Sequence, residues 1–286
     1  MSELGQPAFP AEPAVVESSV AAPAPLPPPA TRVLPADIDT PWGIMDLLLF
    51  FVFAIAMLFL LSAVLSGIAV AQFGVPFTEI EHYSATNAGF VVVQQVIWFG
   101  VLLLFLYAVV HRRTVQPFWR AVGWRGLHVA RLRPLAAVLL FLACGVVLGI
   151  GADIATLFYN TEKHLPIQDL FASPHGLPYL MAFGILVAPF AEETVFRGYV
   201  YPVLAREFGI VAGTALTGIL FGLVHVPQLR GGWGQIATLT AVGLALTAIR
   251  AAARSVTASY LAHLGYNTFL FSGVLLDPET LRHLWR

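Results

Sequence analysis

The stretch LPYLMAFGILVAPFAEETVF, residues 177–196, is long and apolar enough to cross a membrane, yet it carries two adjacent carboxylates near its end. These are Glu192 and Glu193, and Arg197 follows directly after the stretch. A spanning helix needs about 20 mostly apolar residues. An ionisable side chain inside it costs about 2.5–3.5 kcal/mol even on a lenient insertion scale. The stretch therefore predicts a membrane helix that carries a polar site.

The composition of the whole chain agrees with a membrane protein. Of the 286 residues, 58% are hydrophobic and 11% are charged, whereas soluble domains carry about 25% charged residues. The net charge of −1 gives no sign of nucleic-acid binding. Because Cys144 is the single cysteine, an intrachain disulfide and a cysteine-rich metal site are both excluded.

Further apolar segments extend this prediction to an all-α, polytopic transmembrane helix bundle that encloses a polar cavity. We expect seven spans, or eight if a long segment is broken. Arginine is concentrated in the loop after the second span, which predicts a cytoplasmic N-terminus. The size of the chain and its Pro/Ala-rich N-terminal region favour a prokaryotic protein, so we expect the bacterial cytoplasmic membrane. The predicted spans are Ile44–Ala71, Ala88–Val110, Pro134–Phe158, Leu177–Phe196 with an extension, Ile210–Val224, Ile236–Ile249 and Val256–Val274.

The N-terminal region has a different composition. Residues 1–41 hold ten of the twenty prolines and no apolar block, which predicts a disordered tail. The membrane domain is then expected over residues 42–286, and the polar residues fall within about residues 177–275 of it.

The polar residues have spacings that allow them to meet. Glu193 and Arg197 are four apart and share a helix face, as do His263 and Asn267. If the helix continues to Glu207 and turns at Phe208–Gly209, Glu192 and His225 lie equally far from the turn. An antiparallel helix pair would then bring both to the same depth.

This set of side chains suits hydrolysis. A desolvated glutamate such as Glu192 can act as a general base, and His225 can share the attacking water with it. His263 and Asn267 can donate hydrogen bonds to an oxyanion. Alternatively, Glu192, His225 and His263 could hold a divalent metal such as zinc. The sequence leaves the two mechanisms open.

Each of these residues also has a structural interpretation when it is taken alone. A Glu193–Arg197 pair can simply clamp a membrane helix, and a lone histidine near a helix end is more often structural than catalytic. Asn267 can hydrogen-bond a neighbouring helix. The functional interpretation rests on their convergence, because these groups fall on three neighbouring spans with compatible spacings.

At these residues the sequence resembles the CPBP family of intramembrane proteases, also called the CAAX-protease and bacteriocin-processing family. The three family motifs EExxxR, FxxxH and HxxxN are present in order as EETVFR (192–197), FGLVH (221–225) and HLGYN (263–267). The resemblance covers about a third of the chain.

The resemblance implies endoproteolysis of membrane-associated or lipidated proteins near the membrane. It implies that Glu192 and His225 activate water, that His263 and Asn267 stabilise the oxyanion or help bind a metal, and that Glu193 and Arg197 support the site. The zinc-protease motif HExxH and the Gly-x-Ser motif of rhomboid-like enzymes are absent from the sequence, which makes those hydrolases poorer fits. Two further hypotheses remain: a non-catalytic adaptor or bacteriocin-immunity protein, and a small transporter that uses Glu192 and His225 as a proton relay.

Overall fold

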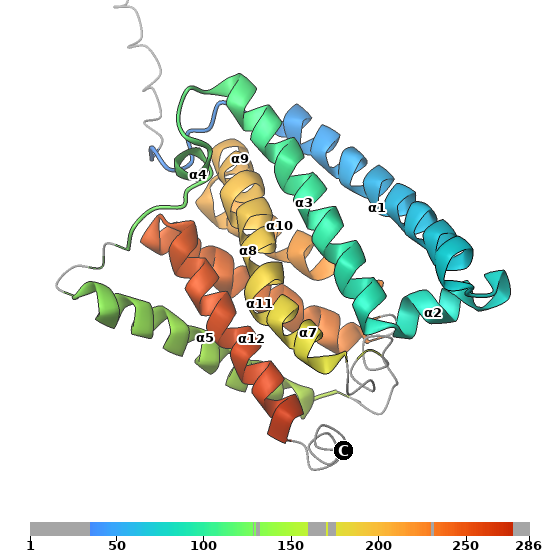
Figure 1. Ribbon diagram of the computed structural model, residues 1–286. Helices are drawn as coiled ribbons and strands as arrows, with labels where there is room; N and C mark the ends of the chain where they lie inside the picture. The colour runs from blue at the N-terminus through green and yellow to red at the C-terminus, as the bar shows by residue number, and fades with distance from the viewer. Residues whose placement is uncertain are drawn as a thin grey trace, which may run out of the picture. The chain divides into compact units, whose positions relative to one another are not determined.

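The computed structural model describes residues 35–127, 129, 132–159, 170, 176–229 and 232–276. These residues belong to the second of two units, which begins at Leu34. They form helices and connecting turns, and no strand occurs among them (Figure 1). The all-α prediction is therefore confirmed for the described part of the chain.

A helix occupies each of the seven predicted spans, but the predicted number of spans is not confirmed. Five helical stretches are both long and apolar enough to cross a membrane. Helix α10 (Ile210–Leu223) is too short, and α12 (Val256–Leu276) is not among the five, although it has 21 residues. Polar residues such as His263 and Asn267 lower the hydropathy of α12. The five stretches are α1 (Ile44–Phe73), α3 (Ala88–Arg113), α5 (Pro134–Thr156), Leu177–Phe208, and α11 (Trp233–Ala253).

The stretch Leu177–Phe208 changes its helical type along its length. Its α-helical parts are α7 (Leu177–Ala182), α8 (Ala188–Glu193) and α9 (Tyr201–Phe208). Between them lie two π-helical segments, η2 (Phe183–Val187) and η3 (Thr194–Val200), in which N–H groups bond five residues back. Each is followed by a proline, Pro189 or Pro202, in the first turn of the next α-helix. Three short elements, η1 (Phe77–Glu79), α2 (Ile80–Thr86) and α4 (Phe118–Ala121), join the longer helices.

Glycines allow two helix pairs to pack closely. A Cβ on Gly145 of α5 would lie 1.8 Å from the Ala262 carbonyl oxygen of α12, and a Cβ on Gly265 would lie 2.2 Å from the Leu142 carbonyl oxygen. Helices α10 and α11 meet in the same way at Gly222, where a Cβ would lie 2.0 Å from Thr240 Oγ1. Small residues at helix contacts are typical of membrane bundles, because dispersion contacts replace the hydrophobic effect there.

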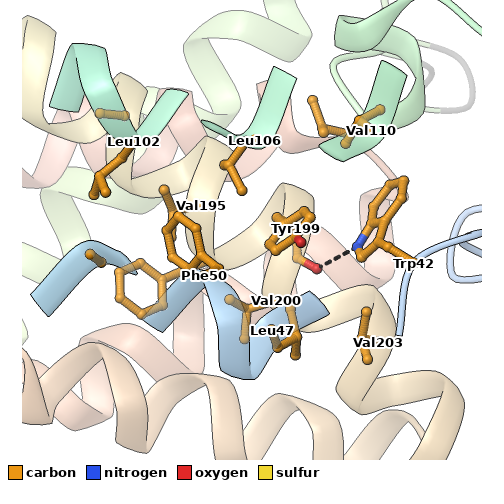
Figure 2. Packing of buried hydrophobic residues seen from close by; sticks show 14 of the residues in the cluster. Trp42, Leu47, Phe50, Leu102, Leu106, Val110, Val195, Tyr199, Val200 and Val203 are labelled. Atoms are coloured by element: carbon orange, nitrogen blue, oxygen red, sulfur yellow. Dashed lines mark hydrogen bonds between the residues drawn. The ribbon is translucent and has the colours of Figure 1, made fainter. Parts of the chain in front are cut away.

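A hydrophobic cluster joins α1 and α3 to η3 and α9 (Figure 2). Tyr199 lies within it and is fully buried. Its ring stacks on Trp42 at a centroid distance of 5.4 Å, and its carbonyl oxygen accepts a 3.0 Å hydrogen bond from Trp42 Nε1. Pairs of aromatic rings in such contacts add about 0.5–1.5 kcal/mol beyond their burial. The cluster fixes the helix that carries the Glu192–Arg197 motif against the first two spans.

The end of the expected N-terminal tail is packed against the helices, contrary to a fully disordered segment ending at residue 41. Asp37, Ile38 and Thr40 are buried. Asp37 Oδ2 accepts a 3.0 Å bond from Arg250 of α11, and the Thr40 carbonyl accepts one from Arg206 of α9. Composition could not reveal these contacts, because both partners are far away in sequence. The rest of the expected tail, residues 1–34, lies outside the described residues.

Candidate active site

The π-helical segment η2 leaves one backbone carbonyl available for a side chain. The Ala188 N–H bonds to the Phe183 oxygen, five residues back. In the same pattern, the Gly184 carbonyl would accept a hydrogen bond from the N–H of residue 189. That residue is Pro189, which has no N–H. The Gly184 carbonyl accepts instead a 2.6 Å hydrogen bond from Nδ2 of Asn267 on α12. Asn267 thus holds α12 against the helix that carries the glutamates.

Glu193 lies at the centre of a buried charge network. Its side chain has no exposed surface, and its Oε1 atom accepts a 2.8 Å bond from Arg197 Nη1. The same oxygen accepts a 2.9 Å bond from Nδ1 of His263. The predicted pairing of Glu193 with Arg197 is therefore present, and it extends to a histidine 70 residues further along the chain.

Arg197 makes further contacts that the sequence did not reveal. Its Nη2 donates to the Gly243 carbonyl at 2.9 Å, and its Nε donates to Thr247 Oγ1 at 3.3 Å. Its guanidinium also lies 4.5 Å from the centre of the Phe221 ring. A buried guanidinium needs partners for its donors. By finding them on neighbouring helices, Arg197 holds α10 and α11 against η3.

His263 is oriented by this network toward Glu192. A carboxylate can only accept, so the hydrogen between His263 and Glu193 is on Nδ1. Nε2 of His263 then lies 3.7 Å from Oε2 of Glu192, too long for a direct hydrogen bond. Glu192 keeps 16% of its side-chain surface exposed, whereas the Glu193 side chain beside it has none. The two adjacent carboxylates therefore have different environments, as the 100° rotation between neighbouring helical positions requires.

His225 follows the end of α10, and its ring is fixed by the residue four positions earlier. Its Nδ1 lies 2.7 Å from the Phe221 carbonyl oxygen, and the two rings are 4.9 Å apart. Since the carbonyl accepts, Nδ1 carries the hydrogen and the neutral ring has its lone pair on Nε2. The chain turns between α9 and α10 at Gly209, whose φ is 90°. This is the turn from which Glu192 and His225 are equally distant along the sequence.

Glu192, His225, His263 and Asn267 all line one cavity of about 410 Å³. Glu193 and Arg197 are not on its wall and support it from behind. The wall also includes polar residues that we did not predict. Gln95 could have been suspected as a polar residue within a predicted span, whereas Tyr266 carries no distinctive signal. The unpredicted polar residues on the wall are Gln95, Asp153, Thr156, Tyr159, Gln228, Gln235, Thr238 and Tyr266.

The arrangement does not fit the predicted metal alternative. Among the described residues, no three His, Cys, Asp or Glu side chains form a group that could hold a metal ion. His263 uses Nδ1 for Glu193 and His225 uses Nδ1 for a backbone carbonyl, so Nε2 is the atom of each ring that a metal could reach.

A buried carboxylate and two imidazoles therefore line one cavity among the apolar helices. Residues 174–269 match the family described as Rce1-like, type II CAAX prenyl endopeptidase. The resemblance to the CAAX-protease family that the three motifs indicated is thereby confirmed for this third of the chain. The family is one of proteases, and the apolar helices make the chain an integral membrane protein. No curated protein and no solved structure gives a significant match.

Proposed function

We propose that the chain is an intramembrane endopeptidase in which Glu192 activates water for attack on a peptide bond. The observation that carries the proposal is the contrast between the two glutamates. Glu193 is fully enclosed and bonded to Arg197 and His263, whereas Glu192 faces the cavity that two imidazoles also line. A structural clamp accounts for Glu193 but gives no reason for Glu192 to face the cavity.

In the proposed reaction, Glu192 takes a proton from a water molecule that Nε2 of His225 helps to hold. The water oxygen forms a bond to the carbonyl carbon of the peptide, and the carbonyl oxygen becomes an oxyanion. The proton on Glu192 then passes to the peptide nitrogen as the C–N bond breaks. The direct products are a new carboxylic acid and a new amine, and the acid then gives its proton to the amine, so atoms and charges balance.

His263 and Asn267 are proposed to stabilise the oxyanion. Nε2 of His263 can donate to the oxyanion when it carries a hydrogen, and the bond from Nδ1 to Glu193 holds the ring in place. Asn267 uses one hydrogen of Nδ2 for Gly184 and has a second available for the oxyanion. Arg197 balances the charge of Glu193, so that this buried carboxylate stays ionised.

Hydrolysis can be tested with purified protein in lipid nanodiscs. The wild type and Glu192→Gln would be incubated in ¹⁸O-labelled water with peptides that carry an apolar segment. We expect the wild type to produce fragments with ¹⁸O in the new C-terminal carboxylate. Glu207→Gln makes the same chemical change at a partly exposed glutamate of α9 and should behave like the wild type. Equal cleavage by Glu192→Gln would reject the assigned base.

A further inference from the structure

The residues that line the cavity come from one end of the bundle. They lie near the first residues of α3, α7 and α11 and near the last residues of α5 and α12 (Figure 1). Two of the lining side chains at this end, Asp153 of α5 and Gln228 in the turn after α10, are exposed. The cavity therefore reaches the surface of the protein at this end.

The opposite direction is closed by packed side chains. Behind Glu192, the residues Glu193, Arg197 and Thr247 have no exposed surface, and Phe221 is 1% exposed. Further along, Arg250 fills the space between α11 and the N-terminal segment through its bond to Asp37. Packed side chains thus close the route to Glu192 from the opposite end of the bundle, within the described residues.

The closed end is the arginine-rich end. Arg113 ends α3, Arg133 precedes α5, Arg206 lies in the last turn of α9, and Arg254 follows α11. At the open end, the connection 74–87 contains Glu79 and Glu81 and neither lysine nor arginine. The other two inter-helix connections at that end contribute Lys163 and Arg230, and the sequence after α12 adds Arg282 and Arg286, against six arginines between residues 112 and 133 at the closed end. Arginine and lysine are retained on the cytoplasmic side of bacterial membrane proteins, so the closed end is assigned to the cytoplasm.

We propose that the cavity opens to the non-cytoplasmic side of the membrane, and that its substrates are apolar peptide segments presented from that side. This inference rests on the proposed peptidase function for the identity of the substrate, but not for the direction of opening. The wall next to Glu192 is mostly apolar and includes Val92, Phe99, Phe183 and Leu270. Such a wall suits apolar side chains, while Gln95 and Gln228 can bond an extended peptide backbone.

The direction of opening can be measured without any activity. In a Cys144→Ser background, single cysteines would be placed at Gln228 and at Asp153 on the cavity rim. A third cysteine at Gln116, which is exposed between α3 and α4, marks the arginine-rich end. Intact spheroplasts would be treated with a membrane-impermeant maleimide, and permeabilised cells would give the total reactive cysteine.

We expect Gln228→Cys and Asp153→Cys to react in intact spheroplasts, and Gln116→Cys to react only after permeabilisation. Reaction of Gln116→Cys alone in intact spheroplasts would overturn the proposal, because the cavity would then face the cytoplasm. Failure of both rim cysteines to react under either condition would also overturn it, because the rim would be closed. Labelling needs no catalysis. If the rim cysteines react as expected but the protein cleaves no peptide, the peptidase proposal is rejected and the direction of opening still holds.

The choice of substrate gives a second, independent measurement. One apolar segment would be fused to a membrane anchor so that it is presented on either side of the membrane. We expect cleavage by the wild type, and not by Glu192→Gln, only when the segment is on the non-cytoplasmic side. Cleavage confined to the cytoplasmic presentation would contradict the proposal while supporting the peptidase function.

Discussion

Nδ1 of His263 lies 2.9 Å from Oε1 of Glu193, and the Glu193 side chain has no exposed surface. The contact joins the first and the last of the three sequence motifs across two different helices. It sets the hydrogen on Nδ1 and turns Nε2 of His263 toward Glu192. The contact holds Glu193 behind the wall and leaves Glu192 on the cavity, which is the contrast that supports the proposed roles of the two glutamates.

Glu193→Gln should impair both stability and catalysis. The change leaves the buried Arg197 cation without its carboxylate, which we expect to cost about 3 kcal/mol in free energy of unfolding. It also removes the charge that orients His263, which should lower kcat by about 10³-fold. Glu192→Gln should lower kcat without this loss of stability. Thermal unfolding in detergent would measure the stability of the two variants, and peptide cleavage would measure their kcat. If Glu193→Gln were as stable as the wild type, the supporting role assigned to Glu193 would be contradicted.

Because Asn267 bonds the Gly184 carbonyl that Pro189 leaves without a backbone donor, we expect the effects of changing Asn267 and Pro189 on the free energy of unfolding to be coupled. Asn267→Ala should cost about 1 kcal/mol, since hydrogen bonds between membrane helices are worth about this much. Pro189→Ala supplies an N–H that can bond the Gly184 carbonyl, so the same asparagine change should cost less in that background. A double-mutant cycle of unfolding free energies measures this difference. Strict additivity of the two changes would contradict the proposed reason for the bond.

The close approach of α5 and α12 predicts that Gly145→Ala is destabilising. Its new Cβ would lie 1.8 Å from the Ala262 backbone oxygen, which cannot move without displacing the helix that carries His263. We expect a loss of about 1–3 kcal/mol, with a parallel fall in activity. Gly151→Ala, on the same helix, meets no atom within 4 Å and is the matched control. Equal melting temperatures for the two variants would show that the packing is looser than described.

The N-terminal segment should contribute to stability through Asp37. Asp37→Asn leaves the nearly fully buried Arg250 unpaired, at an expected cost of about 3 kcal/mol. Asp39→Asn, two residues away and exposed, should change the free energy of unfolding by less than about 0.5 kcal/mol. Unfolding of both variants in the same detergent is the measurement. If they unfolded alike, the segment would not be part of the packed domain.

Chelation distinguishes the two mechanisms that the sequence left open. Because no group of described side chains fits a metal ion, we expect cleavage to continue at an unchanged rate after dialysis against EDTA. A zinc-dependent peptidase treated in parallel should lose activity. Loss of cleavage that returns on addition of zinc would show that Glu192, His225 and His263 rearrange to bind it.

Several features of this site follow from spacing within a single helix. Four-residue separation predicted the Glu193–Arg197 pair, and equal distances from a turn at Gly209 predicted that Glu192 and His225 come near each other, which agrees with their lining the same cavity. The apolar segments predicted where helices form. These inferences succeed because helical geometry relates sequence distance to spatial distance.

Contacts between distant helices were not predictable in this way. The bond of His263 to Glu193 spans 70 residues, and that of Asp37 to Arg250 spans 213. The π-helical segments also escaped prediction, because a proline signals a disturbed helix but not its type. The predicted number of spans is not confirmed, because length and composition support five helices, α10 is short and α12 carries polar residues.

The most direct test of the peptidase assignment is a comparison of protein N-termini in membranes of cells that express the wild type or Glu192→Gln at matched levels. Glu207→Gln would serve as the control for the substitution itself. The account predicts new N-termini that depend on Glu192 and are present with the wild type and the control. Identical N-terminal profiles for all three proteins across several growth conditions would contradict proteolysis and favour a non-catalytic adaptor.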